Sequence, residues 1–137
     1  MTLRERAKDY YQNDYNCAEA MLRAINDAYG LNLPEGSLHL AAGFGGGMGC
    51  EKACGALCGG IAALGPLLVT DKAHAAENFG AKCAQLVQAF ERDLGSDLCA
   101  DLKPRYRTNE TRCLTTVELA ADSFEQEMAA QGILPKG

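Results

Sequence analysis

The stretch at residues 45–60 restricts the folds open to this chain more than any other part of its sequence. It reads Gly-Gly-Gly-Met-Gly-Cys-Glu-Lys-Ala-Cys-Gly-Ala-Leu-Cys-Gly-Gly, so its cysteines are interleaved with glycines. Each glycine inside a helix costs about 1 kcal/mol relative to alanine. A helix this rich in glycine therefore needs a neighbouring helix packed very close, or a bulky inorganic group that must approach the backbone.

Seven cysteines occur in the 137 residues. Thiols at this density bind metal, form disulfides or carry out redox chemistry. The first residues are charged and no signal peptide follows them, and no apolar run approaches the roughly 20 residues that span a bilayer. We therefore expect a cytoplasmic protein without membrane insertion, whose thiols are kept reduced. The odd cysteine count also argues against a secreted disulfide framework.

The charge of the chain disfavours nucleic acid as a partner. The formal net charge is -5, whereas nucleic-acid binding requires a basic face. The one cationic run, at residues 103–107, is expected to be a solvated loop. Tryptophan is absent and other aromatic residues are few, which also disfavours base stacking.

Helix-start signals and apolar periodicity divide the chain into helices. Thr2 and Asn16 each stand where an N-cap would begin a helix, and Gly30 stands where the second one would end. The helical segments expected from these patterns are approximately 2–12, 16–30, 37–42, 50–64, 70–94 and 111–131. No segment alternates with strand period for long. We predict one all-α domain over residues 1–137, a bundle of about five to six helices with a glycine-rich loop at 43–49 before the cysteine-rich helix.

The cysteine-rich helix is expected to present Cys50, Cys54 and Cys58 on one narrow face, because a step of four residues turns a helix by only about 40°. The N-terminal end of a helix lowers a thiol pKa, so Cys50, and to a lesser degree Cys54, should be activated. Successive N–H groups of the glycine loop can form an anion-binding nest. The glycines expected beside a cofactor are Gly45, Gly46, Gly47, Gly55 and Gly59.

The absence of two common motifs excludes some kinds of cysteine and glycine-loop chemistry. There is no Cys-x-x-Cys pair, so a thioredoxin-type dithiol and a zinc ribbon do not fit. The glycine loop lacks the Gly-Lys-Ser/Thr of a P-loop. Cys83 lies on the apolar stripe of its predicted helix and is expected to be a core residue.

Several segments, in order along nearly the whole chain, resemble the C-GCAxxG-C-C family of redox-active proteins. They are Tyr-Asn-Cys-Ala-Glu at 15–19, Gly-Phe-Gly-Gly-Gly-Met-Gly at 43–49, Cys-Gly-Ala-Leu-Cys-Gly at 54–59, Gly-Ser-Asp-Leu-Cys at 95–99 and Cys113. The resemblance implies electron transfer or redox sensing, and it places the four signature cysteines at Cys17, Cys54, Cys99 and Cys113. Related domains joined to multihaem cytochrome segments are associated with an iron–sulfur centre. Cys50, Cys58 and Cys83 are additional to the four-cysteine pattern.

Three functions remain open at this stage. Four thiolates from separate elements suit an iron–sulfur cluster, with Cys50 and Cys58 as further candidate ligands, and they also suit structural zinc. Without metal, Cys54 would attack a disulfide and Cys99 or Cys113 would resolve it. In the third function the cysteines only pack a non-catalytic helical module. The partner would be a redox protein or a small redox molecule. A homodimer, and whether the protein is an enzyme, are left open.

Overall fold

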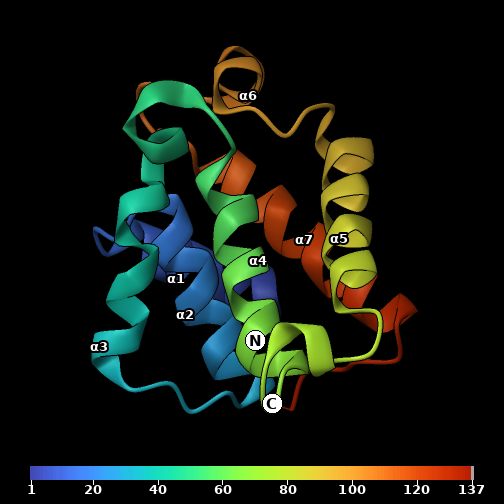
Figure 1. Ribbon diagram of the computed structural model, residues 1–137. Helices are drawn as coiled ribbons and strands as arrows, with labels where there is room; N and C mark the ends of the chain where they lie inside the picture. The colour runs from blue at the N-terminus through green and yellow to red at the C-terminus, as the bar shows by residue number, and fades with distance from the viewer. Residues whose placement is uncertain (137) are drawn as a thin grey trace.

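The chain forms an all-helical bundle in the computed structural model, which describes residues 1–136 (Figure 1). The α-helices are α1 (Leu3–Gln12), α2 (Cys17–Tyr29), α3 (Glu35–Leu38), α4 (Gly55–Leu68), α5 (Phe79–Leu94), α6 (Cys99–Tyr106) and α7 (Leu114–Ala130). Three short helical turns, η1 (His39–Phe44), η2 (Gly47–Glu51) and η3 (Ala73–Ala75), join them. The predicted all-α class is confirmed, but these residues contain seven α-helices rather than five or six.

The first two helices begin where the sequence predicts. Thr2 accepts a hydrogen bond from the Glu5 N–H, and the Glu5 carboxylate accepts one from the Thr2 N–H, which completes a capping box. Asn16 and Glu19 repeat this arrangement at the start of α2. Gly30 then ends α2 in the left-handed region at φ 65°, where glycine carries no Cβ penalty. These local signals fix both ends of α2 without help from the rest of the fold.

Helix α2 is the centre of the bundle and packs against α1 and α4, while α7 packs against α1 and α5. Gly59 explains how close α2 and α4 come. A Cβ on Gly59 would lie 2.5 Å from the Ala18 carbonyl oxygen and 3.0 Å from the Met21 Cβ. The largest fully buried side chains of the bundle include Tyr29, Phe90, Phe124, Met21, Ile25 and Leu64. Close helix packing is thus one reason for the glycines of α4.

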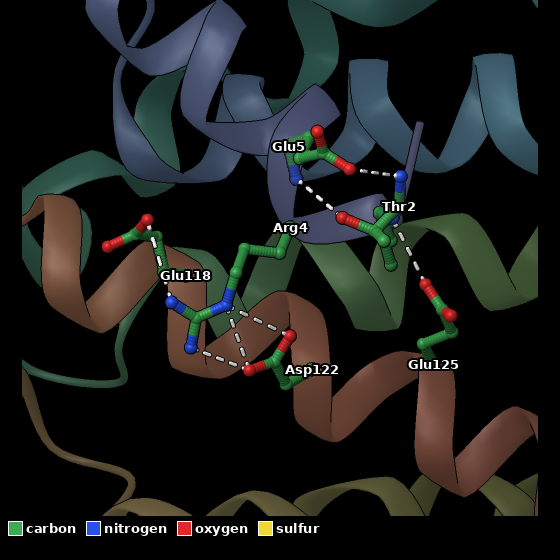
Figure 2. A network of polar contacts seen from close by, with 7 residues as sticks. Thr2, Arg4, Glu5, Glu118, Asp122 and Glu125 are labelled. Atoms are coloured by element: carbon green, nitrogen blue, oxygen red, sulfur yellow. Dashed lines mark hydrogen bonds and ion pairs between the residues drawn. The ribbon is translucent and has the colours of Figure 1, made fainter.

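Polar contacts fasten α1 to α7 (Figure 2). The Arg4 guanidinium donates from Nη2 to Asp122 Oδ2 at 2.6 Å and lies 3.6 Å from Glu118 Oε2. The Leu3 N–H donates to the Glu125 carboxylate at 3.1 Å. The Arg4 and Asp122 side chains are partly exposed, so each ion pair contributes up to about 1 kcal/mol to stability. The network mainly sets how α1 lies against α7.

The cysteine-rich helix begins later than predicted, at Gly55 rather than Cys50. Residues 46–49 and Glu51 coil through backbone conformations that a right-handed helix does not use, including φ 60° at Met48 and φ 61° at Glu51. Cys50 and Cys54 therefore do not share a helix face with Cys58, and the predicted single face of three cysteines is wrong. Helix α4 also continues past Gly65 and Pro66 to Leu68, beyond its predicted end.

Two other boundaries differ from the prediction. Helix α5 starts at Phe79, because Asn78 has φ 56° and interrupts the helix predicted from residue 70. Residues 99–106, where no helix was predicted, form the eight-residue helix α6, which includes Pro104. In Figure 1, α6 lies at the top of the bundle, where it contacts η2 and α7. None of the helices in residues 1–136 is long and apolar enough to cross a membrane.

The contact at Gly59 gives a stability prediction. Gly59→Ala should lower the free energy of unfolding by about 1–3 kcal/mol, because the new methyl group overlaps the Ala18 carbonyl. Urea denaturation would measure the change. Gly80→Ala in α5 is the matched control, since nothing lies within 4 Å of its Cβ position, and it should be neutral or stabilising by up to about 1 kcal/mol. Equal midpoints for the two variants would contradict the close α2–α4 contact.

Candidate functional site

The four signature cysteines each stand at the beginning of a different helix. Cys17 and Cys99 are the first residues of α2 and α6, and Cys54 and Cys113 are the N-caps of α4 and α7. The N-terminal end of a helix carries unpaired N–H groups and a partial positive charge. Each of these sulfurs is therefore attached at the end of a helix that favours negative charge.

Backbone pairing brings two of these helix starts together. The Cys54 N–H donates to the Asp97 carbonyl at 2.8 Å, and the Cys99 N–H donates to the Lys52 carbonyl at 2.7 Å. These bonds flank an antiparallel bridge between Ala53 and Leu98. Cys54 and Cys99 thus stand diagonally across a short two-stranded contact.

The other two cysteines are tied to the bundle through polar side chains. The Tyr11 hydroxyl accepts a hydrogen bond from the Cys113 N–H at 3.0 Å, which connects α1 to the start of α7. Asn16, the cap that precedes Cys17, donates from Nδ2 to the Ala42 carbonyl at 2.9 Å. This bond fixes the start of α2 against η1.

All four signature cysteines line one cavity of about 220 Å³. Its lining consists of Tyr11, Asn16, Cys17, Gly46, Cys54, Gly55, Cys99, Leu102, Lys103, Arg107, Arg112, Cys113 and Thr116. We call it the cysteine cavity. Residues separated by almost a hundred positions in the sequence thus line one small space.

Burial dominates the pKa shifts of Cys17, Cys54 and Cys99. Burial raises the pKa of Cys54 to about 12, although the N–H groups of Leu57 and Ala56 favour its thiolate. Burial also raises the pKa of Cys17, against the opposing effect of the Gly46 N–H, and the pKa of Cys99, against the opposing charge of Lys103. The prediction of an activated Cys54 is therefore wrong for the free thiol, because loss of hydration outweighs the favourable helix end.

Three cations line the cysteine cavity, and no carboxylate does. Lys103 pairs with Glu51 at 3.1 Å, and the Arg112 guanidinium lies 5.0 Å from the centre of the Tyr11 ring. Arg107 follows the last residue of α6 and is exposed. The expectation that residues 103–107 form a solvated loop is therefore wrong, since most of them belong to α6 and two line the cavity. The one available signal was the spacing of four residues from Cys99 to Lys103.

The glycines predicted beside a cofactor have different surroundings. Gly46 and Gly55 line the cysteine cavity, and a Cβ on Gly55 would lie 2.5 Å from the Cys17 sulfur. Gly45 makes room for the Asn16 side chain, and Gly47 for Lys52 and Cys99. Gly59 makes room for α2. The last three glycines thus bring protein segments together around the cysteines.

The remaining cysteines lie elsewhere. Cys50 is exposed, and its sulfur lies 3.7 Å from the Gly47 carbonyl oxygen. Cys58 is half-buried in a separate apolar groove with Phe44, Ile61 and Val87. Cys83 is half-buried and packs against the core, as its position on an apolar stripe suggested. The structure thus separates these three from the cysteine cavity.

The arrangement of the sulfurs bears on what they could hold. Within residues 1–136, no group of three or more His, Cys, Asp or Glu side chains is arranged to hold a single metal ion. A tetrahedral zinc site needs its sulfurs about 2.3 Å from one centre. Binding of a single ion by these cysteines would therefore require their side chains to move.

Fold and site together define an all-α protein with four cysteines around one cavity. Residues 15–127 match the family described as "Putative redox-active protein (C_GCAxxG_C_C)", and the chain belongs to this family. Comparisons with curated proteins and with solved structures find no significant match. The description of the family gives a redox-active class, and its four signature cysteines line the cysteine cavity.

Thiol reactivity tests whether burial or the helix N-terminus has the larger effect on the pKa of Cys54. In the reduced, metal-free protein, Cys54 should react with iodoacetamide far more slowly than exposed Cys50 at pH 7.5. Its raised pKa leaves little thiolate, which is the reactive form, and the rate should rise as the pH approaches 12. Peptide mass spectrometry would follow each thiol. Equally fast labelling of Cys54 and Cys50 at pH 7.5 would contradict the effect of burial.

Proposed function

We propose that the protein is an electron-transfer or redox-sensing protein whose centre is an iron–sulfur cluster held by Cys17, Cys54, Cys99 and Cys113. The observation that carries the proposal is the meeting of four helix N-termini, each with a cysteine, at one cavity. All-cysteine ligation is the usual donor set for such clusters. When bound, a cluster would supply reversible one-electron transfer.

The residues of the chain would contribute in three ways. The four thiols would give up their protons and provide sulfur ligands. Backbone N–H groups at the helix starts, such as those of Gly46 and Ala56, are near the sulfurs of Cys17 and Cys54 and would donate to them. Hydrogen bonds of this kind tune the potential of a thiolate-bound centre. Lys103, Arg107 and Arg112 would offset the negative charge of four thiolates.

The size of the site supports a cluster over a single zinc ion. The four cysteines line a cavity of about 220 Å³, which leaves room for a group larger than one ion. Gly46 leaves the cavity wall without a side chain, and nothing lies within 4 Å of its Cβ position, so a bulky inorganic group could approach the backbone there.

A second candidate function is metal-free thiol–disulfide exchange. The diagonal placement of Cys54 and Cys99 across the Ala53–Leu98 bridge favours it. In that case an oxidised substrate would accept two electrons from the pair, and a Cys54–Cys99 disulfide would form. The reduced centre would consist of the free thiols of the structure.

Cluster content separates the two functions. Protein purified anaerobically should contain iron and sulfide and should absorb visible light. Cys17→Ser, Cys54→Ser, Cys99→Ser and Cys113→Ser should each lose most of the iron, because each removes a proposed ligand. Cys83→Ser and Cys50→Ser, outside the cavity, should retain it.

Two results would reject the cluster. One is protein without iron both as isolated and after anaerobic reconstitution. The other is equal iron in all six variants. If mild oxidation of iron-free protein instead links Cys54 to Cys99, the thiol–disulfide function would be supported.

A further inference from the structure

The charge around the cysteine cavity is opposite to that of the whole chain. The protein carries a formal net charge of -5, yet the cavity is lined by Lys103, Arg107 and Arg112 and by no carboxylate. Glu51 pairs with Lys103 at 3.1 Å and neutralises one of the three. The charges of Arg107 and Arg112 therefore make the lining of the cysteine cavity net positive.

Arg107 and Arg112 differ from three other arginines of the bundle, which form ion pairs with carboxylates. Arg4 is paired with Asp122, Arg23 with Glu35 and Arg92 with Asp93. Within the described part of the chain, neither Arg107 nor Arg112 has a carboxylate within 4 Å. The charge of these two guanidinium groups is thus not balanced by a direct ion pair.

Both guanidinium groups border an opening rather than the interior. Arg107 and Arg112 are exposed, whereas Cys54 and Cys99 behind them are buried. Arg112 lies over the Tyr11 ring, and Tyr11 accepts a hydrogen bond from the Cys113 N–H. The contact with Tyr11 favours a position of Arg112 beside Cys113. We call Arg107 and Arg112 the arginine pair.

A guanidinium group presents its N–H donors in a planar fork that matches the oxygens of a carboxylate or phosphate. Cations along a recess also raise the local concentration of anions. We propose that the arginine pair binds the oxyanion group of a small redox compound, and that this compound exchanges electrons with the cysteine centre. The site thereby selects a carboxylate- or phosphate-bearing donor or acceptor over a neutral or cationic one. This substrate class rests on the proposed redox function, but the binding step does not require metal.

A pair of alkylating reagents that differ in charge tests the binding step. In reduced, metal-free, full-length protein, Cys113 at the cavity would be compared with Cys50, which is exposed and outside it. For each cysteine, the labelling rate with anionic iodoacetate is divided by the labelling rate with neutral iodoacetamide. In low salt, this ratio should be at least roughly threefold higher at Cys113 than at Cys50. Sodium chloride at roughly 0.5 M should reduce the preference, because it screens exposed charges.

Variants and competing anions show whether the arginine pair causes the preference of Cys113 for iodoacetate. Arg107→Gln and the double variant Arg107→Gln/Arg112→Gln should progressively remove the preference at Cys113. Arg92→Gln removes the same charge from α5 and should preserve it. Inorganic phosphate and succinate, added separately, should slow iodoacetate labelling of Cys113, and whichever competes better identifies the oxyanion group.

The proposal is overturned if Cys113 and Cys50 show the same reagent preference. It is also overturned if Arg92→Gln removes the preference as fully as Arg107→Gln does, or if neither competitor has an effect. Iron content, measured on the same preparations before chelation, reports on the cluster separately. A protein without iron that retains the anion preference would reject the cluster and keep the arginine pair.

Discussion

The site depends on one constraint, the meeting of four helix N-termini at one small cavity. A helix end leaves N–H groups without partners, and these must be satisfied by a side chain, water or a ligand. Here each end carries a cysteine, and Lys103, Arg107 and Arg112 add formal positive charge nearby. The surroundings therefore favour negative charge on sulfur, whereas burial of the free thiols disfavours it. Any ligand that replaces the thiol protons would relieve this conflict.

The glycines make the convergence sterically feasible. Gly59 lets α2 approach α4, and Gly55 leaves room for the Cys17 sulfur at the junction of the same helices. Gly47 allows Cys99 to lie against η2. The positive φ angles of residues 46–49 then turn the chain so that α4 starts at the cavity wall. Glycine is thus needed here both for close packing and for backbone conformations that other residues rarely adopt.

Scaffold and site overlap at the cysteines. Caps, the α1–α7 ion pairs and the apolar core hold the bundle together, and Cys54 is part of that core while Cys17 and Cys113 pack against it. Cys83 also packs against the core and Cys50 is exposed, and neither of them lines the cysteine cavity. The cysteine cavity combines exposed Arg107 and Arg112 with buried Cys54 and Cys99, so the proposed redox centre would be reached past the two arginines.

The sequence by itself determined the helical class, the start of α1, both ends of α2 and the family, since these depend on local signals such as capping boxes and motif spacing. Three features were decided only by the tertiary structure. Cys50 does not line the cysteine cavity, residues 99–106 form the helix α6, and Arg107 and Arg112 line the cavity. The helix predicted at Cys50 was wrong because helical periodicity does not register φ angles above zero. The cationic run was misread because its place at the cavity depends on residues far away in the sequence, such as Tyr11 and Cys17, and on the ion pair between Lys103 and Glu51. Burial of Cys54 likewise depends on long-range packing, and it reversed the direction expected for its pKa.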